Sequence, residues 1–438
     1  MTRPDPSAAA GPPGAGPTVD ESVPVPAAAT VGPTAGTTAA TDPPDTTDPP
    51  DTAPSARAQW WAATKIAGGI WLIFTTLRYF VAAVTEYLFQ PDHGRLAQGV
   101  VGVLKLPSNF DASYFAAIAR FGYFGDINPP SIWQAFFPGY PVVVRAVSAA
   151  TTFQVTDGRL MVAGAFVSAA CSLIATVVVF RLAESTGALR AGACAALLLM
   201  LWPTATFLTA AYSESLYLAL AVGAWWNALK SRWWVAGLLC AYASFTRING
   251  VFLAAALLVL LLVRVARGQE RFRFHKLIAI GIGPAGAAGY LGYLWVTTGN
   301  PRAWQAAQIE GWGRETVWPW TSLTNTVDAL VGIDDPVRQA QWAIDIVAVA
   351  FCLLAAVYMV YRRYWPELTL TLITVGVLAS SFNYMSILRN TLTIFPLFVI
   401  GGGILARRRE WFTAMVLTLS GVWMVGTTML FTLSKWAG

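Results

Sequence analysis

Charged side chains are scarce in this chain: of its 438 residues only 12% are charged, whereas 56% are hydrophobic. Soluble domains carry about 25% charged residues. Half that fraction of charged residues cannot cover the surface of a soluble protein of this length. The mean hydropathy of +0.54 also indicates a membrane protein. The composition therefore excludes a soluble protein and predicts a multi-pass membrane protein, in which each span needs about 20 apolar residues.

Histidine and cysteine are also rare. The chain has two histidines and four cysteines, and none of them has the spacing of a metal site. The sequence contains no phosphate-binding glycine loop, HExxH motif, nucleophile elbow or haem-attachment motif. We therefore predict no metal and no bound cofactor, and because the basic residues are scattered we expect no nucleic-acid partner. If the chain is a transferase, the absence of a nucleotide-binding motif favours a lipid-linked donor over a soluble nucleotide sugar.

The first 57 residues lack aromatic side chains altogether, yet they contain 13 of the 26 prolines and repeat the motif DPPDT. Such a segment cannot bury enough apolar surface to offset the entropy of ordering. We predict two regions: a disordered cytoplasmic tail over residues 1–57 and a membrane domain over residues 58–438. The tail has a net charge of −5 and the membrane domain one of +11, which together give the +6 of the chain.

Apolar segments follow one another through the membrane domain. They predict an all-α, polytopic fold of about eleven transmembrane helices, some of which are short for a hydrocarbon core of about 30 Å. The eleven segments are 66–89, 159–181, 188–203, 214–229, 233–246, 250–264, 276–298, 340–361, 366–384, 390–406 and 411–433.

Lysine and arginine gather in alternate loops, which the positive-inside rule places in the cytoplasm. This orientation puts the N-terminus inside the cell and two long loops, about 90–158 and 299–339, on the extracytoplasmic face of the plasma membrane. Within the first loop, residues 110–121 and 136–147 are apolar enough to form short helices on the membrane surface. We therefore expect the functional chemistry on the extracytoplasmic face.

Asp111 is the candidate catalytic residue of the first outer loop. If it begins a helix, Tyr114 and Phe115 share a face with residues one turn further on, and this face holds the carboxylate near the lipid headgroups. A carboxylate there can accept a proton from the hydroxyl group of a lipid-bound substrate. The alternative is that Asp111 only caps the helix.

Three further charged residues stand at the ends of apolar segments. Glu214 lies where a helix re-enters the membrane, with Ser213 as a possible cap. The alternative role for this carboxylate is a favourable interaction with the dipole at the N-terminus of that helix. Arg247 separates two short apolar segments, where it either pairs with an acid or reaches the interface. Arg389 precedes another segment and can hold an anionic group.

The second outer loop is rich in tryptophan, which forms an interfacial belt in most membrane proteins and can also stack on sugar rings. Arg314 follows one of these tryptophans. With this loop included, the residues that we expect to bind substrate are Tyr114, Tyr123, Tyr212, Glu214, Arg247, Arg314 and Arg389.

Four of these motifs, in this order, resemble the GPI mannosyltransferase II (PIG-V-like) family of the GT-C glycosyltransferases. They are the segments 111–141, 212–217, 245–250 and 386–396. The resemblance implies a GT-C-like fold and the inverting transfer of mannose from a polyprenyl-phosphate carrier to a lipid-linked or other acceptor. It also implies that Asp111 is the general base, although Phe110 stands where the family commonly has tryptophan.

The sequence thus predicts a membrane mannosyltransferase, with Arg389 or Arg247 balancing the charge on the departing phosphate. A GPI precursor is the acceptor in the family's name, but the Ala-, Pro- and Thr-rich tail is typical of a high-GC bacterial chain. There a glycolipid, a cell-wall polysaccharide or a protein is the expected acceptor. Two alternatives remain: a transporter or lipid flippase, which intramembrane Arg78, Arg247 and Asp345 would suit, and a scaffold that binds partners through its tail.

Overall fold

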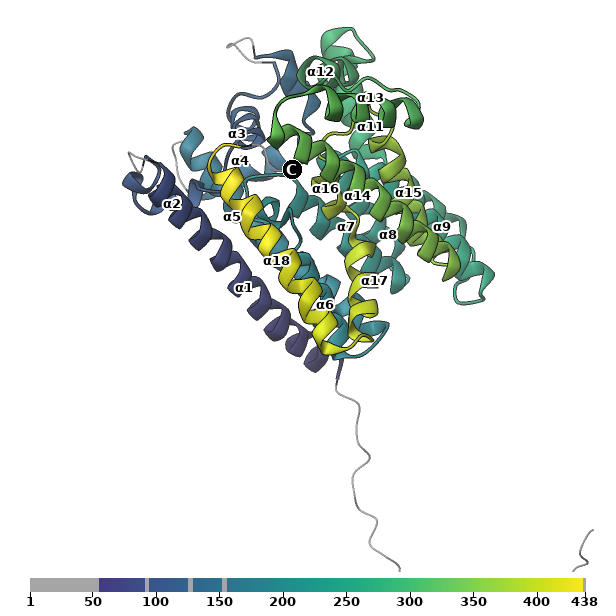
Figure 1. Ribbon diagram of the computed structural model, residues 1–438. Coiled ribbons are helices and arrows are strands. Elements are labelled where there is room, and N and C mark those ends of the chain that lie inside the picture. Colours follow the sequence, from purple (N-terminus) through teal and green to yellow (C-terminus); the bar gives the residue numbers. More distant parts are fainter. Residues whose placement is uncertain (1–54, 91–93, 125–128, 152–155, 436–438) are drawn as a thin grey trace, which may run out of the picture. The chain divides into compact units, whose positions relative to one another are not determined.

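A computed structural model describes residues 55–90, 94–124, 129–151 and 156–435, so nearly all of the predicted tail lies outside the described residues. The described residues form helices and no named strand (Figure 1). The α-helices are α1 Ala56–Phe89, α2 Val100–Lys105, α3 Asp111–Phe121, α4 Gly139–Thr151, α5 Asp157–Ser185, α6 Leu189–Met200, α7 Glu214–Leu229, α8 Trp233–Thr246, α9 Asn249–Ala266, α10 Phe274–Gly281, α11 Ala285–Thr298, α12 Ala303–Trp312, α13 Pro319–Gly332, α14 Pro336–Tyr361, α15 Trp365–Leu378, α16 Ile387–Asn390, α17 Phe395–Ala406 and α18 Glu410–Thr432. Four 3₁₀ helices join them: η1 Leu96–Gln98, η2 Ser131–Ala135, η3 Ala205–Leu208 and η4 Thr391–Thr393.

All eleven predicted segments fall on helices, which confirms an all-α membrane fold, but eleven separate spans are not confirmed. Among the described residues, five helices are long and apolar enough to cross a membrane, and up to seven spans result if each of two bent pairs counts as one. The pair α10 and α11 bends by 44°, and the segment Ile387–Thr393 bends by 82° against α17. Helices α6, α8 and α15 are only about 18–21 Å long at 1.5 Å per residue, too short to span alone.

The first outer loop contains the predicted short helices. Helix α3 covers the predicted stretch 110–121 almost completely, and α4 begins at Gly139, three residues into the stretch 136–147. Both pack against α5, which also contacts α1, α6 and α7 (Figure 1). The loop is therefore anchored on the bundle, with Asp111 at the start of α3.

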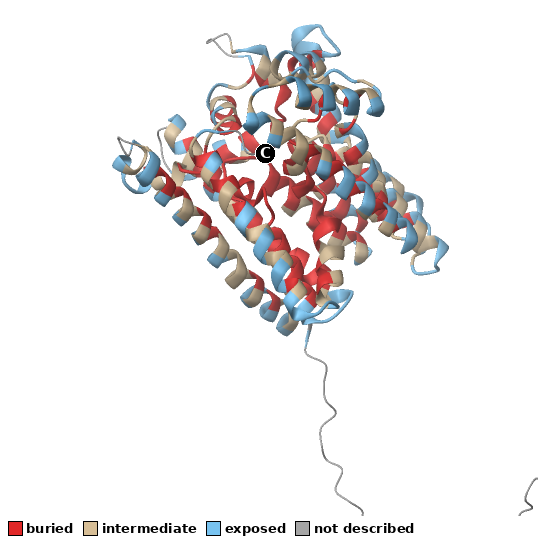
Figure 2. Cartoon of the chain, viewed as in Figure 1, coloured by how far each residue is buried: buried red, intermediate tan, exposed pale blue. Residues whose placement is uncertain are grey.

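Buried residues are concentrated where α5, α6 and α7 meet α17 (Figure 2). Small residues permit this close approach: a Cβ atom added to Gly402 of α17 would lie 2.5 Å from the Cβ of Ala195 on α6. By contrast, many large apolar residues of α1, α14 and α18 are exposed, as expected for helices that face lipid.

The loops predicted to be cytoplasmic meet at one end of the bundle. Arg190 donates a hydrogen bond to the carbonyl oxygen of Arg408 at 3.2 Å. Glu270, in the loop after α9, lies 2.5 Å from the ammonium group of Lys276 and accepts a hydrogen bond from Ser231 at 2.5 Å. Asp111 lies at the other end, as the alternation of loops predicts.

A labelling experiment tests the orientation of the bundle, which stays a prediction. A membrane-impermeant maleimide applied from outside should label a cysteine placed at exposed Arg302 and miss one placed at exposed Gln269. Three of the native cysteines are buried and Cys171 is half-buried, so unsubstituted protein gives the background. The opposite pattern would place Asp111 in the cytoplasm. In the first outer loop, a probe at Asp126 would be expected to label in the same way, but this position lies outside the described residues.

Glu270 links the loop after α9 to Lys276, Ser231 and Trp233. Replacing it should lower the free energy of unfolding by an amount that depends on pH. Burial raises the pKa of this carboxyl, but hydrogen bonds from Lys276, Ser231 and Trp233 outweigh that effect and lower the pKa to about 2. The stabilisation is therefore present above pH 4.5, the ordinary value, and is lost as the pH falls toward 2. We expect E270Q to cost about 1 kcal/mol at pH 7 and about a quarter of that at pH 2.5, measured by chemical unfolding in detergent. An equal loss at both pH values would contradict this assignment.

Candidate functional site

A cavity of about 1160 Å³ lies at the end of the bundle that carries α3. Its lining comes from α3, α8, α9, α12, α14, α15 and α16 and from the loops that join them. Of the residues predicted from sequence, five line it: Asp111, Tyr114, Arg247, Arg314 and Arg389. Tyr212 and Glu214 are fully buried and contact those that line the cavity.

Asp111 is the first residue of α3, and its side chain does not cap that helix. Phe110 occupies the cap position with a φ of 50°, and no side-chain capping bond forms there. The Tyr212 hydroxyl instead accepts a hydrogen bond from the Asp111 backbone N–H (3.1 Å) and donates to the carbonyl oxygen of Asn109 (2.8 Å). The capping interpretation of Asp111 is therefore wrong, because its carboxylate turns to an arginine.

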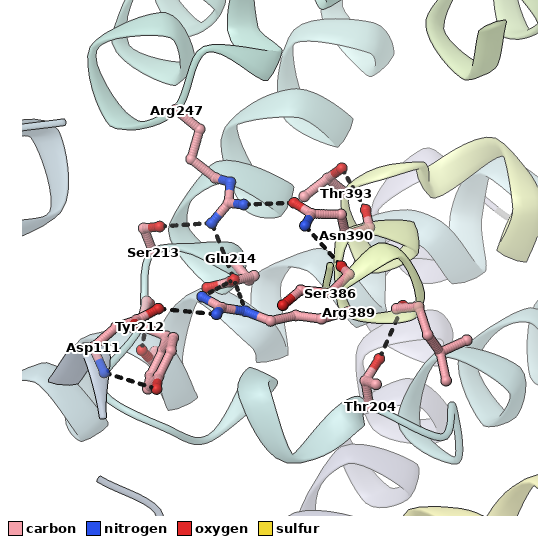
Figure 3. A network of polar contacts seen from close by, with 12 residues as sticks. Asp111, Thr204, Tyr212, Ser213, Glu214, Arg247, Ser386, Arg389, Asn390 and Thr393 are labelled. Atoms are coloured by element: carbon pink, nitrogen blue, oxygen red, sulfur yellow. Dashed lines mark hydrogen bonds and ion pairs between the residues drawn. The ribbon is translucent and has the colours of Figure 1, made fainter. Parts of the chain in front are cut away.

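Arg389 connects two carboxylates that are far apart in the sequence (Figure 3). Its Nη1 atom donates to Asp111 Oδ2 at 2.9 Å, and its Nε atom donates to Glu214 Oε1 at 2.7 Å. The guanidinium carbon also lies 4.6 Å from the ring centre of Tyr212 and 4.7 Å from that of Phe207. Arg389 is thus a buried cation whose charge is shared between two acids and two aromatic faces.

Arg247 completes this network from the other side of Glu214 (Figure 3). Its Nη1 atom lies 3.0 Å from Glu214 Oε1 and donates to the Ser213 hydroxyl, while Nη2 donates to Asn390 Oδ1 at 2.8 Å. The expectation that Arg247 pairs with an acid is confirmed, and the alternative that it only reaches the interface is wrong. Ser213 occupies the N-cap position of α7, as expected, but its side chain makes no capping bond, and its hydroxyl accepts from Arg247.

The four charges of this network balance: two carboxylates, Asp111 and Glu214, face two guanidinium groups, Arg389 and Arg247. A buried charge is stable only when it is paired and hydrogen-bonded. Glu214 supplies most of the pairing, since its Oε1 atom contacts both arginines. We name these four residues the charge network.

Asp345 and Asn390 hold the segment that carries Arg389. Asp345, on α14, accepts a hydrogen bond from the backbone N–H of Leu388 at 3.1 Å. Asn390 donates to the carbonyl oxygen of Ser386, which has a φ of 60°. The sequence showed Asp345 only as an intramembrane charge, and it gave no role to Asn390. Their proximity depends on helices that meet only in the folded chain.

Arg314 lines the same cavity but belongs to no ion pair among the described residues. Its Nη1 atom donates to Gln308 Oε1 at 3.2 Å, and its guanidinium lies 5.7 Å from the ring centre of Trp312. Burial lowers the pKa of Arg314 to about 10, and the charge of Arg389 contributes to this shift. Arg314 is therefore a cation without a carboxylate partner, facing the cavity.

The three predicted tyrosines have different surroundings. Tyr114 lines the cavity and packs against Phe136, with ring centres 5.2 Å apart. The ring of Tyr212 packs against the guanidinium of Arg389. Burial raises the pKa of the Tyr212 phenol well above the usual value, and the nearby charge of Asp111 adds to this shift. Tyr123 is not brought to the cavity: its hydroxyl donates to the Phe136 carbonyl at 2.7 Å and its ring packs on Tyr290.

The described part of the chain brings together no group of three or more His, Cys, Asp or Glu residues that could hold a metal ion. Tryptophans from the second outer loop, by contrast, do reach the cavity. Trp304 and Trp312 line it beside Gln305 and Gln308. Aromatic rings beside amide groups suit a ligand with both apolar faces and hydroxyl groups.

The fold and this cavity define a class: an all-α, multi-pass membrane protein with a network of buried charges at one end of its helices. Comparison with known families is more specific, since residues 75–274 match the family described as Mannosyltransferase (PIG-V). The resemblance inferred from the four sequence motifs is thus confirmed over that range. It contains Asp111, Glu214 and Arg247, whereas Arg314 and Arg389 lie beyond it.

The chain is also similar to GPI alpha-1,6-mannosyltransferase 2 from several mammals. It is 33% identical to the Mus musculus protein over 168 residues, which is 36% of this chain and 31% of that protein. With the Homo sapiens protein the identity is 32% over 168 residues, again 36% of this chain and 31% of the relative. The chain therefore matches about a third of the length of these curated relatives.

Among solved structures, the chain is similar to ArnT from Cupriavidus metallidurans bound to undecaprenyl phosphate. The match covers 83% of this chain and 70% of the ArnT chain, with 13% identity and a TM-score of 0.47. The Archaeoglobus fulgidus oligosaccharyltransferase AglB, in complex with an inhibitory peptide and a dolichol-phosphate, covers 69% of this chain and 48% of its own. Its identity is 12% and its TM-score 0.39. Likenesses this low carry no argument about substrate or mechanism.

Proposed function

We propose that this chain is a membrane mannosyltransferase. It takes mannose from polyprenyl-phosphate-mannose and transfers it to a lipid-linked or cell-envelope acceptor on the extracytoplasmic face. The observation that carries the proposal is the position of Asp111: within the range that matches the mannosyltransferase family, its carboxylate faces a large cavity and is oriented by Arg389.

Asp111 is the general base in this proposal. Its Oδ2 atom is held by Arg389, while Oδ1 accepts no hydrogen bond from any described residue and is available to an acceptor hydroxyl. The hydroxyl oxygen bonds to the anomeric carbon from the face opposite the phosphate, and its proton passes to Asp111. The bond between the anomeric carbon and the phosphate oxygen breaks with its electron pair on the phosphate. Transfer therefore inverts the anomeric centre.

Arg314 is better placed than Arg389 to bind the phosphate of the donor. Arg389 already contacts both Asp111 and Glu214, and Arg247 contacts Glu214. Arg314 has no carboxylate partner among the described residues, and its Nη1 atom donates a hydrogen bond to Gln308. A guanidinium with free N–H groups in a partly dry cavity binds phosphate strongly. The geometry thus favours Arg314 over the two arginines expected from the sequence.

Replacing Arg314 by glutamine should weaken donor binding by about 10- to 100-fold, the value of one hydrogen bond to a charged group. Because the pKa of Arg314 is lowered to about 10, the wild-type kcat/KM for the donor should be constant up to about pH 9 and fall as the pH passes 10. R314Q should lack this fall. A wild-type profile that is flat to pH 11, or that R314Q shares, would remove Arg314 from the donor site. The matched control is R338Q, an exposed arginine at the rim of the same cavity.

A reconstituted system separates this proposal from the flippase alternative. The full chain in proteoliposomes is given labelled polyprenyl-phosphate-mannose together with a lipid extract from its host. A transferase yields a new labelled product of different mobility. If label only changes leaflet, with no covalent product from any extract, the chain is a flippase and the proposal is wrong.

A further inference from the structure

A second cavity, of about 730 Å³, lies at the end of the bundle opposite the charge network. It is a groove between the ends of α5 and α7 on one side and α15 and α17 on the other. Its walls are largely apolar and include Leu182, Trp225, Phe395, Val399 and Ile400. Its rim carries three arginines, Arg190, Arg407 and Arg408.

These three arginines have no carboxylate partner among the described ion pairs. Arg190 donates to a backbone carbonyl, that of Arg408, and all three side chains are exposed. Glu367 is the one acidic residue among those lining the groove, so the lining carries an excess of positive charge. An apolar trough with a basic rim between membrane helices matches the two parts of an anionic lipid, its chains and its headgroup.

We propose that this groove binds an anionic diacyl phospholipid from the adjacent leaflet. The acyl chains lie against Trp225, Phe395 and Val399, and the phosphate headgroup contacts the three rim arginines. A free phosphate ion would satisfy the rim but would leave the apolar walls of the groove uncovered, so the groove suits a lipid better.

Two of the helices that line the groove, α7 and α17, are connected to the charge network. Trp225 of α7 packs edge-on against Phe395, the first residue of α17, with ring centres 5.2 Å apart. Glu214 is the first residue at the other end of α7, and Arg389 lies six residues before Phe395. A bound lipid would therefore contact α7, which presents Glu214, and α17, which follows the segment that carries Arg389, and its binding should stabilise the folded protein.

The rim is tested by native mass spectrometry of the purified full chain in detergent, with phosphatidylglycerol added and phosphatidylcholine as the neutral comparison. Wild-type protein should retain phosphatidylglycerol preferentially. Each arginine removed should weaken binding about fivefold, so the triple variant R190Q/R407Q/R408Q should lose most of it. The matched control is R362Q/R363Q, which removes two arginines at the same end that do not line the groove.

The trough is tested separately, with all charges kept. A Cβ atom added to Gly403, which lines the groove, meets nothing within 4 Å, so the leucine of G403L should extend into the trough. Gly426 of α18 also has open space beside it, and G426L is the matched control. G403L should lower phosphatidylglycerol retention and abolish the rise in unfolding temperature that this lipid gives to wild type, whereas G426L should do neither.

Equal retention of both lipids by wild type would overturn the proposal, as would unchanged retention in G403L. Displacement of the lipid by inorganic phosphate alone would instead indicate a simple anion site and would also overturn it. The measurement reads lipid binding rather than sugar transfer, so its outcome is independent of the proposed enzymatic function.

Discussion

Replacing Asp111 by asparagine should lower the rate of mannose transfer by about 10²- to 10⁴-fold while the protein remains folded. This is the usual contribution of a general base. Asparagine has the same size, and its side-chain oxygen can still accept the hydrogen bond from Arg389 at the position of Oδ2. What is lost is the ability to take a proton from the acceptor hydroxyl. The measurement is the initial rate with labelled donor, alongside the unfolding temperature of each variant.

The control for this variant is D157N. Asp157 is the first residue of α5, as Asp111 is of α3, and its side chain pairs with Arg120 at the surface. The substitution and the helix position are thus the same, while the surroundings differ. D157N should transfer mannose at nearly the wild-type rate. A D111N variant that does so as well would remove Asp111 from the reaction.

Replacing Glu214 by glutamine should destabilise the protein by about 3–5 kcal/mol, the cost of leaving a buried charge without its partner. Glu214 is fully buried, and one of its oxygens contacts both Arg389 and Arg247. After the substitution Asp111 is the only acid of the charge network left to balance buried Arg389 and half-buried Arg247. Activity should fall as well, because Arg389 then orients the Asp111 carboxylate less well. The free energy of unfolding in detergent measures the first effect.

A second substitution distinguishes lost charge balance from lost packing. The double variant E214Q/R247Q removes one charge of each sign from the charge network, so it should regain part of the stability that E214Q loses. E410Q is the control, since Glu410 is the exposed first residue of α18. If the double variant is less stable than E214Q by the full effect of R247Q alone, the two residues are not coupled and the charge network does not act as a unit.

The helices of the membrane domain could be predicted from sequence because they depend on local composition. The segments 214–229 and 233–246 match α7 and α8 residue for residue. The number of spans could not be predicted, since hydropathy does not reveal that a helix is broken or too short. The predicted segment 390–406, for example, contains the 82° bend before α17.

The same contrast applies to the site. Asp111, Glu214, Arg247 and Arg389 could be selected because charges are rare in apolar surroundings, and the structure brings them together. Their pairing could not be derived, because Asp111 and Arg389 are separated by 278 positions. The positive φ of Phe110, the residue before Asp111, also has no signal in the sequence. Tyr123 fits the motif spacing, yet its hydroxyl is used by the Phe136 carbonyl.

The most direct test of the central claim is a comparison of donors with the purified wild-type chain. Labelled polyprenyl-phosphate-mannose and labelled nucleoside-diphosphate mannose are each incubated with the same acceptor extract, and product formation is followed. The account predicts transfer from the lipid-linked donor and none from the nucleotide sugar. Transfer from the nucleotide sugar, or no transfer from the lipid-linked donor with any acceptor extract, would contradict it.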